Sequence, residues 1–316
     1  MSQPLKVVFF GTPEFAQKSL EAIHCSRHQV VGVVTVMDKA SGRGQKIQAS
    51  PVKQYAEAEQ LPILQPEKLR DPQFLEAVKA WDADIFVVVA FRMMPKILFQ
   101  MPRLGTFNLH ASLLPDYRGA APINFAIING ETTTGVTTFY INEKIDEGNL
   151  LLQKSTPIGA DEDAGSLHDR LMLIGADLVV ETLDRIAENT ITETPQPDVA
   201  VPKNAFKIFK EDTRINWRAS GREIYNFIRG LSPYPAAFTT VNIGEEAKTL
   251  KIYRGHFEPT EHSRAVGTVE RSKHQFKIFV KDGIYIPEEV QLQGKKRMPV
   301  KDFLNGFQED THISLA

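Results

Sequence analysis

Asn108 and His110 stand two residues apart in the segment GTFNLHAS at 105–112, which is typical of a β-strand. Residues two apart in a strand project from the same face of the sheet. Histidine is the side chain best suited to move protons near neutral pH. An asparagine amide can donate an N–H to an oxygen that gains negative charge in a transition state. The pair therefore suits attack on a carbonyl carbon, with a structural alternative: a histidine bound to a backbone carbonyl and an asparagine that caps a turn.

A stiff turn follows the pair in the segment SLLPDYRGAAP at 112–122. Pro115 and Pro122 restrict their own φ angles and the conformation of the residues before them, and Gly119 permits a bend that other residues avoid. Such a turn can present backbone N–H and C=O groups rigidly to a flat, hydrogen-bonding ligand. Arg118 can hold a nearby carboxylate or pair with an acidic loop.

The loop NEKIDEGNL at 142–150 supplies carboxylates. Asp146 can orient the imidazole of His110 and favour its charged form if the two lie side by side. The alternative is that Glu143, Asp146 and Glu147 are ordinary solvated acids. A site for carbonyl chemistry follows only if the fold brings this loop to the strand.

Three other chemistries are disfavoured. No Cys and His spacing indicates a metal site, so none is predicted. No G-x-S-x-G motif marks a serine nucleophile, and nothing around Ser112 favours that role. The first turn, GTPEF at 11–15, has a single glycine and lacks the G-x-G-x-x-G pattern of dinucleotide-binding proteins.

A basic loop, DKASGRGQKIQASPVK, occupies residues 38–53. Its charged residues are Asp38, Lys39, Arg43, Lys46 and Lys53. If this loop lies near the active edge of the sheet, its cations can grip the phosphates of a large anionic substrate. The alternative is a flexible, solvated loop.

The elements that must position these residues alternate between short apolar runs and helical patterns. This alternation predicts a Rossmann-like, doubly wound and mostly parallel sheet, the α/β class. Ligands bind beyond the carboxyl ends of such strands. The expected strands are 5–10, 30–36, 61–65, 84–91 and 105–112, and the expected helices are 13–24, 51–60, 72–81 and 121–130. Two further strands, 135–141 and 149–158, pair across the acidic loop, and a long helix at 164–189 covers the sheet.

A second domain follows a proline-containing linker at 190–206. A helix is expected at 221–231, and short β-rich runs after it predict a small β-barrel. Those runs are 236–243, 248–257, 266–270, 276–286 and 288–296. The predicted organisation is a catalytic domain at 1–189, the linker at 190–206 and the barrel domain at 207–316.

Charge is divided unevenly between these parts. The 316 residues are 42% hydrophobic and 24% charged, as in an ordinary globular protein. Residues 1–202 carry 18 Lys and Arg against 25 Asp and Glu, whereas residues 203–316 carry 19 against 14. The basic second part is expected to meet a polyanion, although unevenly distributed surface charge is an equal alternative. The single cysteine, Cys25, and the lack of an apolar run of membrane-spanning length predict a cytoplasmic protein.

Several segments together resemble the methionyl-tRNA formyltransferase family. The likeness is densest over residues 5–160 and specific in the Asn-His-SLLP-RG arrangement, which resembles the signature of enzymes that use 10-formyltetrahydrofolate. The segments are FFGTPEFA (9–16), SGRGQKIQASPVKQYA (41–56), NLHASLLPDYRGAAPINFAIINGETTTGVT (108–137) and IDEGNLL (145–151), with weaker likeness in RINW (214–217) and GKKRM (294–298).

The resemblance implies formyl transfer from 10-formyltetrahydrofolate to the α-amine of methionyl-initiator tRNA, without a metal. It makes Asn108, His110 and Asp146 the catalytic group. It implies that Arg43, with Lys46 of the same loop, contacts the tRNA, and that the barrel is an OB-like tRNA-binding domain. The sequence itself has no obvious pairing helix or apolar stripe, and this predicts a monomer. The folate site implied by the resemblance consists of Ser112, Leu113, Leu114 and Pro115.

One departure from the family concerns the loop after the strand at 84–91. The family commonly has Tyr-Gly there, whereas this chain has Phe91-Arg92. Because glycine takes positive φ freely and arginine does not, the geometry of this part of the folate pocket is expected to differ.

Rival functions share part of this pattern. Glycinamide ribonucleotide formyltransferase would have a glycine-rich phosphate loop and no basic second domain. A sugar-nucleotide formyltransferase, or the hydrolase part of a formyltetrahydrofolate dehydrogenase, would share the catalytic group. A non-catalytic tRNA-binding protein would need the basic domain and not the Asn-His pair.

Overall fold

The computed structural model describes residues 3–41, 46–201, 203–272, 275–308 and 311–315. The chain forms two compact units. The first consists of 1–119, 134–156 and 168–204, and the second of 120–133, 157–167 and 205–316. Two segments that lie within the predicted catalytic domain, 120–133 and 157–167, thus belong to the second unit, and the domain boundaries at 189 and 206 stay a prediction.

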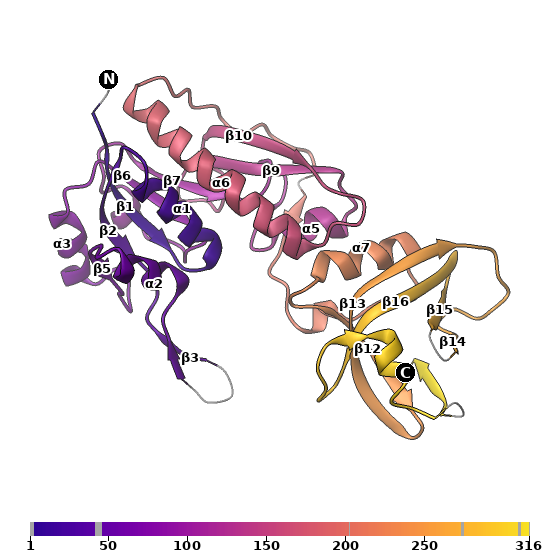
Figure 1. Ribbon diagram of the computed structural model, residues 1–316. Coiled ribbons are helices and arrows are strands. Elements are labelled where there is room, and N and C mark those ends of the chain that lie inside the picture. Colours follow the sequence, from indigo (N-terminus) through magenta and orange to yellow (C-terminus); the bar gives the residue numbers. More distant parts are fainter. Residues whose placement is uncertain (1–2, 42–45, 202, 273–274, 309–310, 316) are drawn as a thin grey trace. The chain divides into compact units, whose positions relative to one another are not determined.

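The first unit contains a seven-stranded sheet (Figure 1). Its strands are β1 (Lys6–Gly11), β2 (Gln29–Val34), β5 (Ile63–Leu64), β6 (Ile85–Val89), β7 (Thr106–His110), β9 (Thr133–Tyr140) and β10 (Leu150–Pro157). They lie in the order β10-β9-β7-β6-β1-β2-β5. The pairs from β5 to β7 are parallel, and β9 runs antiparallel to β7. The predicted mostly parallel sheet is confirmed.

Helices cover both faces of this sheet. They are α1 (Glu14–His24), α2 (Pro51–Ala58), α3 (Pro72–Ala80), α4 (Lys96–Phe99) and α6 (Ala164–Ala187). Residues of α3 and α4 pack against the face that carries Phe10 and Val88. On the opposite face Leu109 approaches α6 so closely that a Cβ on Gly175 would lie 2.8 Å from the leucine Cδ2. Figure 1 shows α6 running across β9 and β10.

Local capping explains where two of these helices begin. The Ser50 hydroxyl accepts a hydrogen bond from Lys53 N at 3.1 Å ahead of α2. The Asp71 carboxylate accepts one from Phe74 N at 3.0 Å ahead of α3. A proline follows each cap, where its missing N–H has no cost. The predicted helices start at these caps.

The second unit is an antiparallel barrel. Its strands are β12 (Ala237–Ile243), β13 (Glu246–Pro259), β14 (Val269–Arg271), β15 (Phe276–Val280), β16 (Gly283–Leu292), β17 (Met298–Pro299) and β18 (Ile313–Leu315). They lie in the order β14-β15-β16-β13-β12-β18, with β17 beside β16. The end strands β14 and β18 contact each other, so the barrel is nearly closed. The barrel prediction is confirmed, although the run at 276–286 is a hairpin rather than one strand, because it turns at Lys281 and Asp282.

Helices complete the second unit. They are α5 (Pro122–Ile128), α7 (Gly221–Leu231) and α8 (Val300–Leu304), with a 3₁₀ turn η1 (Glu211–Thr213). A capping box between Ser220 and Glu223 begins α7. The side-chain amide of Asn124 on α5 donates to Gly230 O at 2.7 Å, which ties α5 to α7. The remaining short strands of the chain are β3 (Lys39–Ser41), β4 (Lys46–Gln48), β8 (Arg118–Gly119) and β11 (Asn204–Ala205).

A buried histidine makes the first unit sensitive to acid. His28 is 4% exposed, and its Nδ1 accepts a hydrogen bond from Leu5 N at 3.1 Å. Its Nε2 lies 3.3 Å from an oxygen of Asp184, a carboxylate that Arg27 also binds. Burial lowers the pKa of His28 below its usual 6.5, and the nearby carboxylate only partly offsets this effect. Protonating Nδ1 would break the bond from Leu5.

We therefore expect the protein to lose stability as the pH falls below about 6.5. The unfolded chain binds the His28 proton more tightly than the folded chain, so acid shifts the equilibrium toward unfolding. Urea midpoints at pH 7.5 and 5.5 measure this loss for the protein and for His28→Gln. The glutamine side chain can still accept a hydrogen bond and does not titrate, so its loss should be smaller. An equal loss in both proteins would contradict the prediction.

Candidate active site

Strand β7 places Asn108 and His110 on one face of the sheet. Asn108 lies between Val88 of β6 and Phe139 of β9 in the pairing register. Because side chains alternate along a strand, Leu109 faces α6 and its two neighbours face the other way. The predicted pair therefore shares a face at the carboxyl end of β7.

Backbone geometry selects the tautomer of His110. The ring is 6% exposed, and its Nε2–H donates to the carbonyl oxygen of Tyr117 at 2.8 Å. Tyr117 has a φ of +61°, a left-handed conformation unusual for a residue with a side chain. This bond places the hydrogen of the neutral ring on Nε2 and leaves Nδ1 as the acceptor nitrogen. The alternative of a histidine bound to a backbone carbonyl is thus observed at Nε2, and Nδ1 is the ring nitrogen that can contact a substrate.

The carboxylate of Asp146 faces that nitrogen. Its Oδ2 lies 3.9 Å from His110 Nδ1 and accepts a hydrogen bond from Gly119 N at 2.9 Å. Asp146 has a φ of +55°. Two residues later, a Cβ on Gly148 would lie 1.6 Å from Tyr140 O, so the loop can pass there only with a glycine. The fold brings Asp146 to His110 on the face of β7 that also carries Asn108, and the catalytic role of the three residues stays a prediction.

The side chain of Asn108 is available for a ligand. It is half-buried, and within the described ranges its amide makes no hydrogen bond and caps no turn. The site therefore presents an amide donor on the same face of β7 as His110.

The turn after β7 is fixed by two polar side chains of neighbouring strands. The Thr137 hydroxyl donates to Ser112 O at 2.6 Å and accepts from Leu114 N at 3.2 Å. The amide of Gln153 donates to Leu114 O at 2.8 Å. The peptide bond from Leu114 to Pro115 is cis. These hydrogen bonds fix the turn that contains the four residues of the predicted folate site, and folate binding there stays a prediction.

Ser112 itself has no free hydroxyl. It is buried, and its Oγ donates to Asp116 O at 2.6 Å. Leu113 is half-buried, and its side chain lies against Gly135, where a Cβ would come within 2.6 Å of it. Any contact of this turn with a ligand therefore uses backbone groups and apolar surface.

The predicted linker contributes a residue that the sequence reading missed. Gln196 Nε2 donates to the carbonyl oxygens of Asp146 at 2.8 Å and Gly148 at 2.9 Å. Its Oε1 accepts from Arg118 Nε at 3.1 Å and Nη2 at 2.6 Å. The pairing of Arg118 with the acidic loop is also confirmed, since its Nη1 lies 3.5 Å from Glu147. The only local signal was a glutamine between two prolines.

The basic loop is described only in part. Arg43 lies outside the described residues, and Lys46 is the first residue of β4, which pairs with β3. Lys53 is engaged at the base of the loop, where its Nζ lies 2.6 Å from Asp38 Oδ2. That hydrogen bond raises the pKa of Lys53 and lowers the pKa of Asp38. The tRNA contacts of Arg43 and Lys46 stay predictions.

The departure at Phe91-Arg92 has a local explanation. The Arg92 guanidinium donates to Glu67 O at 2.8 Å and to Pro66 O, and lies 5.6 Å from the centre of the Phe91 ring. Partial burial lowers its pKa. Positive φ occurs at Ala90 (+46°) and not at Arg92, so the expected conflict with the arginine side chain does not arise.

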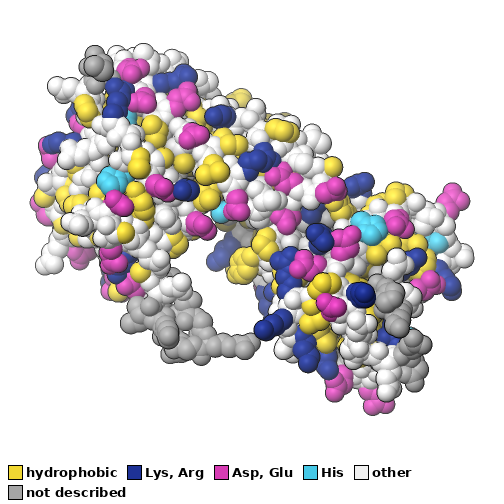
Figure 2. Space-filling model, viewed as in Figure 1, with side chains coloured by type: hydrophobic (Ala, Val, Ile, Leu, Met, Phe, Trp, Pro, Cys, Tyr) yellow, Lys and Arg dark blue, Asp and Glu magenta, His cyan; other side chains and the backbone are white. Residues whose placement is uncertain are grey.

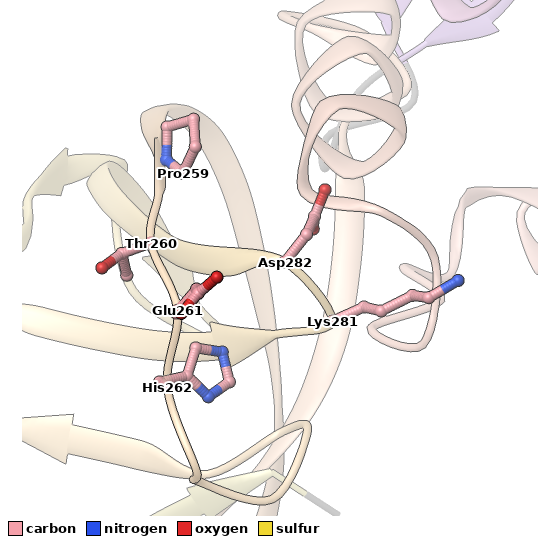
Figure 3. A pocket seen from close by; sticks show the side chains of 6 residues that line it. All are labelled: Pro259, Thr260, Glu261, His262, Lys281 and Asp282. Atoms are coloured by element: carbon pink, nitrogen blue, oxygen red, sulfur yellow. The ribbon is translucent and has the colours of Figure 1, made fainter.

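A shallow hollow lies in the second unit (Figure 3). It has a volume of about 580 Å³ and is lined by Pro259, Thr260, Glu261, His262, Lys281 and Asp282. None of the predicted site residues lines it. Within the described ranges, no group of three His, Cys, Asp or Glu side chains is arranged to hold a metal ion. No helix among those residues is long and apolar enough to cross a membrane.

Comparison with known proteins identifies both parts of the chain. The family model for formyl transferase matches residues 5–183, and the model for the formyl transferase C-terminal domain matches residues 207–308. The chain is 50% identical over 305 residues to a methionyl-tRNA formyltransferase of Flavobacterium johnsoniae, covering 96% of this chain and 97% of the relative. It is 48% identical over 310 residues to that of Bacteroides fragilis, covering 96% of each.

Solved structures agree on the fold. A sugar 3N-formyl transferase, WlaRD, crystallised with dTDP and 5-N-formyl-THF, matches with a TM-score of 0.65 at 22% identity, over 92% of this chain and 99% of that one. At this identity the match concerns architecture alone. With two matched domains and relatives near 50% identity over nearly the full length, this chain belongs to the methionyl-tRNA formyltransferase family.

Proposed function

We propose that Asn108, His110 and Asp146 carry out the reaction of this family in this chain. The chain transfers the formyl group of 10-formyltetrahydrofolate to the α-amino group of methionyl-initiator tRNA, giving N-formylmethionyl-tRNA. The observation that carries the site assignment is the arrangement around His110. Its Nε2 is held by Tyr117 O and its Nδ1 faces Asp146, while Asn108 on the same face of β7 has an amide without a partner among the described residues.

The reaction begins when the α-amine nitrogen attacks the formyl carbon. A bond forms between that nitrogen and the carbon, and the carbonyl oxygen gains negative charge. The amide N–H of Asn108 and the Nδ1–H of protonated His110 stabilise this oxyanion. The distance of 3.9 Å between His110 Nδ1 and Asp146 Oδ2 is too long for a hydrogen bond, so the Nδ1–H can point at a substrate oxygen. At this distance the carboxylate of Asp146 still stabilises the positive charge of the His110 ring.

The intermediate then collapses, and the bond between the formyl carbon and N10 of the folate breaks. The attacking amine must lose a proton, and the departing folate nitrogen must gain one. Asp146 relays the proton from the amine towards the folate nitrogen, and His110, which lies next to Asp146, is the neighbouring proton donor. Atoms and charge balance without a metal or a redox partner.

Other residues of the chain bind the two substrates. The turn of Ser112, Leu113, Leu114 and Pro115 seats the folate, and Arg43 and Lys46 contact the tRNA. The catalytic domain is 1–189, the linker is 190–206, and the barrel domain at 207–316 binds tRNA. Lys and Arg outnumber Asp and Glu after residue 202, and Figure 2 shows several Lys and Arg side chains on the visible face of the second unit. The protein acts as a monomer in the cytoplasm.

The rival substrates differ in what they require of the chain. Glycinamide ribonucleotide needs no second domain, whereas both family models match here. The similarity to a sugar formyl transferase extends to the fold only. A non-catalytic tRNA-binding protein has no need of the Asn108 amide, which makes no hydrogen bond within the described residues and is therefore open to a ligand.

The expected result is formylation of methionyl-initiator tRNA when purified protein is mixed with 10-formyltetrahydrofolate. Parallel reactions contain free methionine, glycinamide ribonucleotide or a dTDP-amino sugar, and none of these should be formylated at a comparable rate. Release of tetrahydrofolate and formation of formyl-methionine on tRNA should rise in equal amounts. Formylation of a small acceptor in place of the tRNA, or folate hydrolysis without transfer, would overturn the assignment.

A further inference from the structure

We propose that Gln196 is a positioning residue for Asp146, so that the segment after α6 is part of the active site and not only a connection to the barrel. The inference rests on the proposed function, because it concerns the carboxylate that faces His110. It is carried by the hydrogen bonds of one side chain, all within the first unit.

Every polar atom of the Gln196 side chain is used. Its amide nitrogen spans the loop by donating to the carbonyls of Asp146 and Gly148. Its oxygen accepts two hydrogen bonds from the guanidinium of Arg118. A primary amide has two N–H donors and one oxygen with two acceptor positions. The bonds to Asp146, Gly148 and Arg118 match that capacity.

These contacts join the two backbone segments that set the catalytic geometry. Arg118 lies between Tyr117, whose carbonyl binds His110, and Gly119, whose N–H binds the Asp146 carboxylate. On the other side, Gln196 holds the backbone of Asp146 itself. Asp146 has a left-handed φ, a conformation that persists only where the surroundings enforce it. The glutamine amide supplies that constraint.

The segment around Gln196 is held independently of it. Thr194 and Leu150 exchange backbone hydrogen bonds of 2.8 and 3.0 Å, and Asn149 Nδ2 donates to Glu193 at 3.0 Å. Prolines on both sides of Gln196 restrict the backbone, so the side chain is presented in a preset direction. Removing the amide should therefore loosen the Asp146 loop without detaching the segment.

Further along, the same segment contacts Tyr117. The backbone N–H of Tyr117 donates to Lys203 O at 2.6 Å, and Lys203 Nζ lies 5.8 Å from the tyrosine ring centre. Both the carbonyl that fixes the His110 tautomer and the loop that carries Asp146 thus depend on residues between α6 and the barrel.

The test compares Gln196→Glu, Gln196→Ala and Asp198→Ala in the full chain. The glutamate keeps the acceptor for Arg118 and loses the donor to the loop. We expect both Gln196 variants to lower kcat about 10- to 100-fold, because small displacements of a catalytic group cost that much. KM for the folate and for methionyl-tRNA should change less than about two-fold. Asp198 is exposed on the same segment and has no part in the site, so Asp198→Ala should match the parent protein.

An Asp146→Asn background separates this inference from the proposed function. If Gln196 acts through Asp146, adding Gln196→Ala to Asp146→Asn should lower the single-turnover rate by less than about two-fold. If Asp146→Asn alone keeps normal turnover, the proposed catalytic group is wrong. If Asp146→Asn is impaired while Gln196→Glu retains kcat, or if the Gln196 effect appears in KM alone, the positioning role is wrong. Melting temperatures of all variants show which samples are folded.

Discussion

Replacing His110 with alanine is expected to lower kcat for formyl transfer by about 10³-fold, because a group that both stabilises an oxyanion and handles protons contributes 10²- to 10⁴-fold. The ring makes one bond that holds it, to Tyr117 O, and presents Nδ1 to the reacting atoms. Removing the His110 ring removes a positive charge that stabilises chiefly the transition state. KM for both substrates should therefore change little. Steady-state kinetics with methionyl-tRNA measures both parameters.

The same substitution also has a cost in stability that must be separated from catalysis. Without the imidazole, the buried residue Tyr117 loses the hydrogen bond that its carbonyl accepts from His110, and losing such a bond costs on the order of 1–3 kcal/mol. Rates are therefore normalised to the folded fraction from thermal melts. His24→Ala is the matched control, since that imidazole, at the end of α1, contacts the Tyr55 hydroxyl and the Glu59 carboxylate and none of the proposed site residues. A His110→Ala protein that is folded and keeps near-normal turnover would show that the proposed mechanism is wrong.

Replacing Asn108 with alanine is expected to lower kcat by about 10²-fold with almost no change in stability. Removing a single oxyanion donor costs 10²- to 10³-fold in kcat. The amide has no hydrogen-bond partner in the described part of the chain, so its removal leaves no protein group unsatisfied. We expect the free energy of unfolding to change by less than about 0.5 kcal/mol. The combination of a large kinetic effect and a small stability effect is the signature of a group that serves the transition state.

Asn108→Asp gives a sharper comparison at the same position. It keeps the shape of the side chain, replaces the N–H donor with an oxygen and adds a negative charge near a developing oxyanion. It should be at least as impaired as Asn108→Ala. An increase in KM with unchanged kcat in either variant would mean that Asn108 binds substrate and transition state equally, contrary to the proposed role.

The two variants also test whether His110 and Asn108 act at the same step of the reaction. The His110 ring is held by a hydrogen bond to Tyr117 O, whereas the side chain of Asn108 makes no hydrogen bond within the described residues. If both contact one oxyanion, their effects should be less than additive in the double variant, because residues that act as a unit are not independent. Additive losses would place them at separate steps.

Local patterns in the sequence predicted the scaffold and most of the site. Alternating apolar runs and helical periods predicted the mostly parallel sheet, which is confirmed by the parallel pairing of β1 with β2 and β6. The two-residue spacing of Asn108 and His110 was enough to place them on one face, because that relation depends only on strand geometry. The family resemblance then supplied the substrates, which spacing alone does not encode.

Tertiary structure alone decided the relations between residues far apart in the chain. The approach of Asp146 to His110, the tautomer set by Tyr117 and the role of Gln196 all depend on how three loops meet after folding. Likewise, the helix α5 belongs to the second unit although it follows β7 of the first unit along the chain. Periodicity reports which face of its own element a residue occupies, whereas these contacts depend on loop closure and on backbone groups, which residue types do not specify.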